Sequence, residues 1–157
     1  MVLAQKFTFE YSRVEDRLKM LINYDSATER IDFFITRAML FKLIPVIEKL
    51  LIKFAEAPVQ RDYERKNLHV NSQSSSAVAH QTDRATLELL QQQLFLLEKV
   101  DFTWHAKNRS VTLLFYTKGA LQCKARLNGE HFSMVMQGMM QAVPHTSWGI
   151  APNILEI

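Results

Sequence analysis

Cysteine and glycine are scarce in this chain of 157 residues, and each shortage excludes a class of protein. The single cysteine, Cys123, cannot form an intrachain disulfide, which excludes a disulfide-stabilised scaffold and predicts a reducing compartment, the cytoplasm. The four glycines form no GxGxxG or P-loop pattern, so no glycine-rich phosphate-binding loop is expected. Catalytic and cofactor-binding motifs of this kind are therefore absent from the sequence.

Long uninterrupted apolar runs are also missing. The most apolar stretch, residues 33–57, contains Pro45 and several charged residues, so we expect no membrane span. The first ten residues, MVLAQKFTFE, lack the apolar core of a signal peptide. With 48% apolar and 22% charged residues, the composition excludes wholesale disorder and predicts one globular domain of residues 1–157.

The net charge of +3 is unevenly placed. Residues 1–98 contain 13 basic and 13 acidic side chains, whereas residues 99–157 contain six basic and three acidic ones. An excess of cations confined to one part of a chain is a weak indication of an anionic partner, and an ordinary solvated surface explains it as well.

Alternating apolar residues predict three strands in each half of the chain. In the first half the strands are predicted at 7–12, 18–24 and 30–36, and in the second half around Phe102, Leu113 and Ala125. A helix follows each set, with Thr36 and Asn128 as predicted N-caps because a hydroxyl or amide oxygen can accept a hydrogen bond from a first-turn N–H. Pro45 predicts a kink in the first helix or its division in two.

A nearly constant offset in residue number relates these elements. Adding 93 maps the first two strands onto their counterparts in the second half, and adding 92 maps the third strand and the helix. We therefore predict an α+β fold of duplicated βββα units with mostly antiparallel strands, a pseudo-twofold axis and an inserted helix. The alternative is a β-sandwich with an inserted helical hairpin, and the pattern does not decide between one sheet and two. The predicted segments are a first βββα unit at 1–57, a polar loop or disordered insertion at 58–82, a helix at 83–98, a second βββα unit at 99–143 and an apolar tail at 144–157.

No arrangement of side chains indicates catalysis or metal binding. The five histidines show no paired spacing, and Cys123 lies at an inward strand position, where a small buried hydrophobe is expected. Asp32 and Asp101 alternate with apolar neighbours, so we expect them to face solvent. We assign no catalytic residues, no metal and no cofactor.

Two surfaces are candidates for binding. The polar face of the second sheet combines cations with a histidine and an aromatic ring, as single-stranded nucleic-acid platforms do. The residues of this predicted basic face are His105, Lys107, Tyr116, Lys118, Lys124 and Arg126. The surplus apolar residues of a leucine seam, the last helix and the tail predict a partner surface of Leu87, Leu90, Leu94, Leu97, Met139 and Trp148.

The leading hypothesis is a non-enzymatic protein–protein interaction or assembly module, as a homodimer or with another protein. The alternative is a single-stranded nucleic-acid-binding protein that uses the basic face. A third hypothesis is a small-molecule enzyme with a pocket between the two units.

Overall fold

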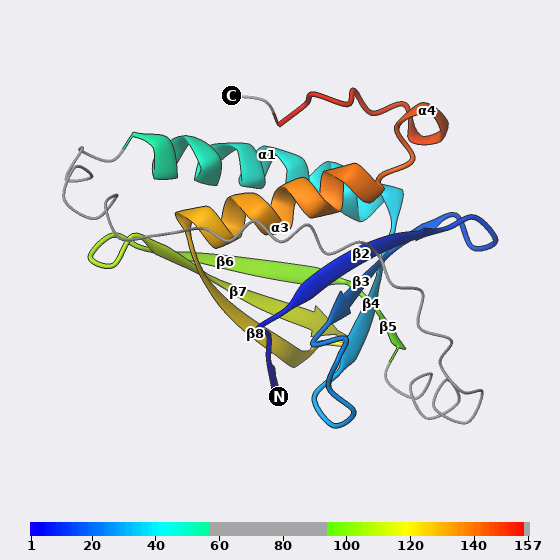
Figure 1. The fold of residues 1–157 in the computed structure, drawn as a ribbon, viewed down its shortest axis with the longest axis horizontal. Coiled ribbons are helices and arrows are strands. Elements are labelled where there is room, and N and C mark those ends of the chain that lie inside the picture. Colours follow the sequence, from blue (N-terminus) through cyan, green and yellow to red (C-terminus); the bar gives the residue numbers. More distant parts are fainter. Residues whose placement is uncertain (57–93, 156–157) are drawn as a thin grey trace.

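The six predicted strands and two short additional ones form two four-stranded sheets in the computed structural model, which describes residues 1–56 and 94–155. One sheet has the strand order β2-β3-β4-β5 and the other β1-β8-β7-β6. Helices α1 and α3 lie side by side on the same side of both sheets (Figure 1). The strands are β1 (Val2–Leu3), β2 (Phe7–Ser12), β3 (Arg17–Ile22), β4 (Ile31–Ile35), β5 (Leu94–Leu96), β6 (Lys99–His105), β7 (Ser110–Thr117) and β8 (Ala120–Asn128). The α+β class is confirmed, with two mixed sheets.

The strand register follows the same offset as the sequence. Phe9 pairs with Met20 in the first sheet, and Phe102 pairs with Leu113 in the second. Met20 also pairs with Phe33, and Leu113 with Ala125. Equivalent residues in the two halves therefore hold equivalent places in the two sheets, as a duplicated unit requires, while the duplication itself stays a prediction.

Each sheet also receives one short strand from the other half. β1 precedes β2 in the chain, yet it pairs with β8, and β5 precedes β6, yet it pairs with β4. Both of these pairings are parallel, whereas all other strand pairs are antiparallel. This exchange interlocks the halves, because neither sheet is complete without residues from both.

The strand β5 corrects the prediction of a helix over 83–98. Leu94–Leu96 is extended and adds to the edge of β4, with Phe95 opposite Phe33. Leucines three and four residues apart suggested a helical seam, but pairing with a distant strand determines the conformation here. The rest of that predicted helix and the predicted insertion at 58–82 lie outside the described residues.

Both predicted helix caps are confirmed. α1 (Arg37–Ala55) begins after Thr36, whose hydroxyl accepts from the Met39 N–H at 3.2 Å, and α3 (Gly129–Ala142) begins after Asn128. The Asn128 side chain accepts from the His131 N–H at 2.8 Å. α1 runs through Pro45 as one helix, so its predicted division is wrong. Pro45 and Phe41 both lie on the exposed side of α1, where water can reach the Phe41 carbonyl that Pro45 leaves without a donor.

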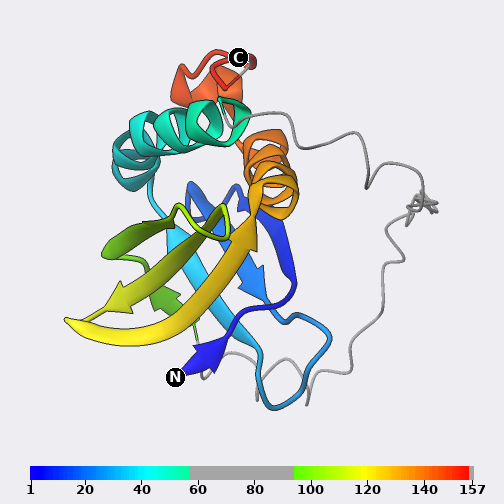
Figure 2. The same cartoon turned by 90° about the vertical axis from the view of Figure 1, so that its left-hand side faces the viewer.

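The core lies between the two sheets and under the helix pair. The sheets meet at an angle beneath α1 and α3 (Figure 2), and their facing side chains fill the space between them. Phe33 of β4 stacks on Phe115 of β7 with ring centroids 5.8 Å apart, so one aromatic pair joins the two sheets. No helix in the described part of the chain is both long enough and apolar enough to cross a bilayer.

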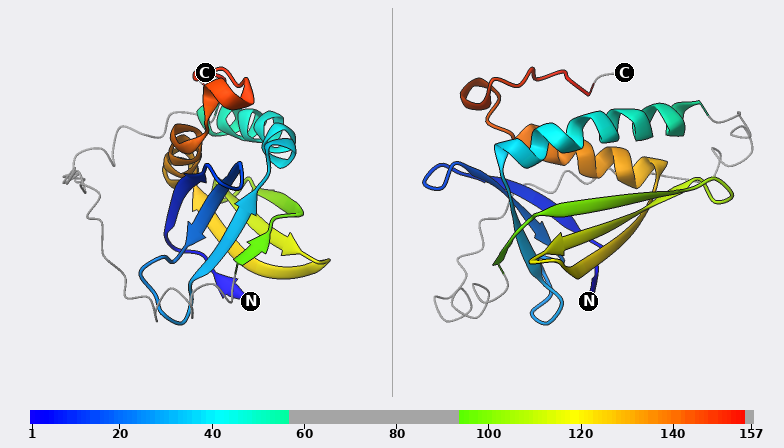
Figure 3. Two further views of the ribbon diagram at one scale, coloured as in Figure 1. Left: turned by 90° about the vertical axis from the view of Figure 1, so that its right-hand side faces the viewer. Right: turned by 180° about the vertical axis from the view of Figure 1, so that it is seen from behind.

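The segment after α3 runs back over α1 (Figure 3). It contains α4 (His145–Trp148), and Trp148, which is 1% exposed, packs edge-on against Tyr11 of the edge strand β2. The Trp148 indole donates to Asp16 at 2.8 Å, and the Tyr11 hydroxyl donates to the same carboxylate. Hydrogen bonds from Tyr11 and then Trp148 hold the pKa of Asp16 below its usual range. Trp148 of the predicted apolar tail is therefore buried against the edge strand β2.

Candidate nucleic-acid interface

Alternation along β7 and β8 decides which side chains reach the outer face of the second sheet. Leu113, Phe115 and Ala125 point into the core and are at most 3% exposed. Their neighbours along the strands, including Lys124 and Arg126, must therefore point away from the core. Both long helices of the described residues, α1 and α3, lie on the other side of the sheets (Figures 1 and 2).

Lys124 and Arg126 lie two residues apart on β8, in neighbouring rows of the sheet. Lys124 is opposite Leu114, and Arg126 is opposite Thr112. The Arg126 guanidinium donates to the Ser110 hydroxyl at 3.3 Å, which holds the side chain along the sheet surface. Within residues 1–56 and 94–155, neither Lys124 nor Arg126 forms an ion pair. Their charges are therefore available to an anion.

Tyr116 occupies the same face near the far end of β7. The Lys99 ammonium lies 4.9 Å from the centre of its ring and also pairs with Asp101 at 2.8 Å. Hydrogen bonding to Asp101 raises the pKa of Lys99. The face thus contains the aromatic ring that the sequence predicts and one cation, Lys99, that the prediction misses. The alternation of β6, which places Lys99 with Asp101, Thr103 and His105, could have identified it.

The structure brings four of the six predicted residues onto one face. His105 lies there in the row next to Arg126, and its ring is 2.8 Å from the Thr112 hydroxyl. Lys107 lies in the turn between β6 and β7, whereas Lys118 lies in the turn between β7 and β8. These turns are at opposite ends of β7, whose eight residues span roughly 26 Å. The two lysines therefore cannot belong to one compact cluster.

The outer face of the first sheet shows a different charge arrangement. At the position equivalent to Lys124 it has Asp32, which is only 4% exposed. The Arg30 guanidinium binds this carboxylate at 2.9 Å, and the Lys19 ammonium approaches it at 4.0 Å. The expectation that Asp32 faces solvent is wrong, because these two side chains cover it. Lys19 and Arg30 on the first sheet are thus paired with a carboxylate, while Lys124 and Arg126 on β8 have no such partner among the described residues.

The predicted partner surface is largely part of the core. Leu97, Met139 and Trp148 are 3%, 3% and 1% exposed, so they cannot present an apolar surface to a partner, and Leu94 is half-buried. Leu87 and Leu90 lie outside the described residues. The correction has a simple cause, since apolar periodicity predicts a buried face but does not say whether the chain itself or a partner buries it.

The described residues offer little for catalysis. Burial raises the pKa of the Cys123 thiol to about 12, so the thiolate needed for nucleophilic attack is scarce at neutral pH. Among residues 1–56 and 94–155, no three side chains of histidine, cysteine, aspartate or glutamate come together as possible metal ligands.

Comparisons with known proteins do not add to this assignment. No protein-family model matches the chain, no curated protein is significantly similar to it, and no solved structure matches its fold.

Proposed function

We propose that this chain binds single-stranded nucleic acid on the outer face of β6, β7 and β8. The observation that carries the proposal is that Lys124 and Arg126, on a sheet face that also contains Tyr116, form no ion pair within residues 1–56 and 94–155. Cations there would contact phosphates, and the tyrosine ring would stack on an unpaired base. His105 and Thr103 would supply polar contacts along the same face.

The contrast between the two sheets supports this choice of face. Asp32 and its two cations satisfy one another on the first sheet, so this cluster gains little from an added anion. Lys124, at the equivalent position, has no ion-pair partner in the described part of the chain, so an added anion would supply one. A flat aromatic and cationic surface also suits a single strand better than a duplex, whose bases are already stacked.

Replacing Lys124 or Arg126 with alanine is expected to weaken binding of a labelled oligothymidine about fivefold to tenfold each. Each variant should also reduce the slope of log affinity against log salt by about one, because one phosphate contact is lost. Tyr116→Leu should weaken binding about tenfold through lost stacking, without changing the salt slope. Fluorescence anisotropy at low and moderate salt measures all three effects.

Lys49→Ala is the matched control. It removes one exposed cation from α1, which lies on the other side of the sheets from the proposed face (Figure 1). It should bind like the unmodified protein. The proposal is wrong if the unmodified chain does not bind at low salt, or if Lys49→Ala weakens binding as much as Lys124→Ala does.

A protein-interaction role remains the second candidate, supported by the outer side of α1. Phe41 and Ile52 lie eleven residues apart, which places them on one side of the helix, and they are 44% and 40% exposed. An exposed apolar stripe of this kind is a typical contact between copies of a helical surface. We propose it as the contact of a homodimer, in place of the buried residues predicted from the sequence.

Phe41→Glu combined with Ile52→Glu is expected to convert such a dimer into a monomer, because the contact would then bury four carboxylates, two from each subunit. Sedimentation analysis over a range of concentrations measures the mass. Val14→Glu, which adds one carboxylate at a fully exposed apolar position in the turn between β2 and β3, should remain dimeric. A monomeric unmodified protein at high concentration would rule out this candidate.

We assign the chain to the cytoplasm on the strength of its cysteine usage. Cys123 is the only cysteine, it is buried and it carries no disulfide. A reducing compartment suits a protein of this composition.

A further inference from the structure

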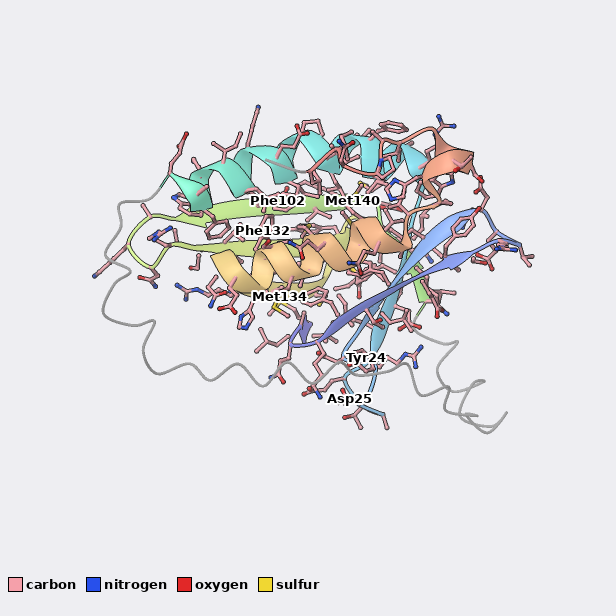
Figure 4. All side chains as sticks on the ribbon, turned by 45° about the horizontal axis from the view of Figure 1, so that its top comes forward. Tyr24, Asp25, Phe102, Phe132, Met134 and Met140 are labelled. Atoms are coloured by element: carbon pink, nitrogen blue, oxygen red, sulfur yellow. The ribbon has the colours of Figure 1, made fainter. Side chains whose placement is uncertain are left out.

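A groove runs between α3 and the edge strand β2, on the side of the molecule where the two halves meet. Its volume is about 830 Å³, within the range of small-molecule sites. Phe7 and Phe9 of β2 form one wall, and Met134 and Val135 of α3 form the other. Met134 lies on the side of α3 that faces away from α1 (Figure 4) and is 61% exposed.

An equivalent groove on the other half of the molecule is nearly filled. It lies between α1 and β6 and has a volume of about 180 Å³. Val100 and Phe102 line it where Phe7 and Phe9 line the larger groove, and Lys42, Leu43 and Val46 take the places of Met134, Val135 and Gly138. The same architecture thus occurs twice, and only one copy is open.

Gly138 is one cause of this difference. It lies in the middle of α3, where glycine costs about 1 kcal/mol relative to alanine. A Cβ at this position would lie 3.7 Å from the Phe9 ring, in ordinary van der Waals contact, so steric exclusion by the protein does not require glycine here. The absent side chain instead leaves space in the groove.

The polar groups of the larger groove favour an anion. Arg126 and His131 lie at the end where α3 begins, and amide side chains of Gln5 and Gln141 also line the groove. Among the described residues that line it, none is acidic. The smaller groove, in contrast, contains Glu98 beside Lys42 and Lys99.

We propose that the larger groove binds a small amphipathic anion, such as an aliphatic or aromatic carboxylate. Its apolar part lies between Phe7, Phe9 and Met134, and its acidic group is bound by the His131 imidazole and by the Arg126 guanidinium, which would turn from Ser110 toward the groove. Apolar walls supply affinity, and the cationic end selects a charged head over a neutral one. This site goes beyond nucleic-acid binding: it shares Arg126 with the proposed nucleic-acid face, whereas Lys124 and Tyr116 belong to that face alone.

Fluorescence titration with 1-anilinonaphthalene-8-sulfonate, an amphipathic anion, tests the proposal, with decanoate and decan-1-ol as competitors. We expect one dye per chain, displaced by decanoate at least tenfold more effectively than by decan-1-ol. Met134→Glu should weaken dye binding at least tenfold, because it places a carboxylate in the groove, whereas Met134→Gln should bind within about twofold of the unmodified protein. Met134 is exposed, so neither change disturbs the core.

Gly138→Val tests the shape of the groove. It introduces the residue that the smaller groove has at the equivalent position, and it should weaken dye binding at least tenfold. Val46→Leu, which alters only the smaller groove, should leave binding unchanged, and thermal unfolding confirms that each variant is folded. Unchanged dye binding in both Met134→Glu and Gly138→Val overturns the proposal.

Two further measurements distinguish binding in the groove from binding on the basic face and from binding to a lipid surface. Lys124 does not line the groove, so Lys124→Ala should weaken oligonucleotide binding and leave dye binding unchanged. Either proposal can therefore fail without the other. Binding to phosphatidylglycerol vesicles in the absence of any binding of monomeric decanoate would overturn the assignment to a free small molecule.

Discussion

Replacing Phe33 with alanine is expected to lower the free energy of unfolding by about 3–5 kcal/mol. The Phe33 ring is fully buried and lies in β4, within the first sheet. It stacks on Phe115 of the second sheet and contacts Phe95 of β5 at a centroid distance of 6.1 Å. Its removal would leave a cavity at the place where the two sheets and the exchanged strand β5 meet.

The surrounding residues cannot easily collapse into that cavity. The position equivalent to Phe33 in the second sheet is Ala125, so only one half of the molecule supplies a large side chain at this level of the core. Both sheets are held by their strand registers, and the cost of a cavity rises when neighbouring elements cannot move to fill it. The effect should therefore be near the upper end of the range.

Equilibrium urea unfolding, followed by circular dichroism, measures this loss. Phe33→Leu keeps most of the apolar volume and should cost about 1–2 kcal/mol. Phe41→Ala, which removes the same side chain from an exposed position on α1, should cost less than about 1 kcal/mol. A Phe33→Ala protein as stable as Phe41→Ala would show that the aromatic contact between the sheets contributes little.

The parts of the fold that depend on local patterns could be predicted from the sequence. Alternation identified β2, β3, β4, β6, β7 and β8, because each is a run of residues with one face in the core. Thr36 and Asn128 marked the helix starts through a hydrogen bond that each makes within its own first turn. The offset between the halves also matched the register, since residues that lie opposite each other in one sheet have counterparts that lie opposite each other in the second.

The strands β1 and β5 could not be predicted in this way. Each has only two or three residues, too few for any period, and each pairs with a strand from the other half. Leu94 and Leu97 continue a spacing that equally suits a helix, so only the distant partner β4 decides the outcome. Contacts between residues far apart in the chain are not visible in a local pattern.

The residues of the candidate sites divide in the same way, into those that a local pattern places and those that depend on the arrangement of distant elements. Lys124 and Arg126 were placed on one face because strand alternation alone requires it. Lys107 and Lys118 were grouped with them, although successive hairpin turns lie at opposite ends of a strand and the predicted topology already separates them. The third hypothesis placed a pocket between the two units, where the larger groove lies, but did not identify its walls. One signal for them was present, since Gly138 interrupts the apolar face of a helix whose counterpart has Val46.

Replacing Asn23 with alanine is expected to cost about 3 kcal/mol, from lost hydrogen bonds and from backbone strain. Asn23 is 4% exposed and adopts a left-handed conformation with φ of 50° directly after β3. Its side-chain oxygen accepts from the backbone N–H groups of Gln5 and Lys6, at 2.9 and 3.2 Å. Its amide nitrogen donates to the carbonyls of Leu3 and Glu29, at 2.9 and 3.3 Å.

These four bonds connect three separate pieces of chain, and they fix the turn by which the chain leaves β1 for β2. Because β1 belongs to the second sheet and β2 to the first, Asn23 holds together one of the two crossings that interlock the halves. No other side chain can make the same four hydrogen bonds, since serine and aspartate lack the two N–H donors and glutamine is too long. Loss of Asn23 should therefore loosen β1 from β8 as well as destabilise the whole fold.

Three variants separate strain from hydrogen bonding, with urea unfolding as the measurement. Asn23→Gly removes the bonds but tolerates a positive φ, so it should recover about 1 kcal/mol relative to Asn23→Ala. Asn23→Asp keeps the shape and the acceptor but turns a carboxylate oxygen toward two carbonyls, so it should be at least as unstable as Asn23→Gly. Equal stability of the alanine and glycine variants would show that backbone strain does not contribute to the destabilisation by Asn23→Ala. An aspartate variant as stable as the unmodified protein would show that the bonds to Leu3 and Glu29 are not what keeps β1 in the second sheet.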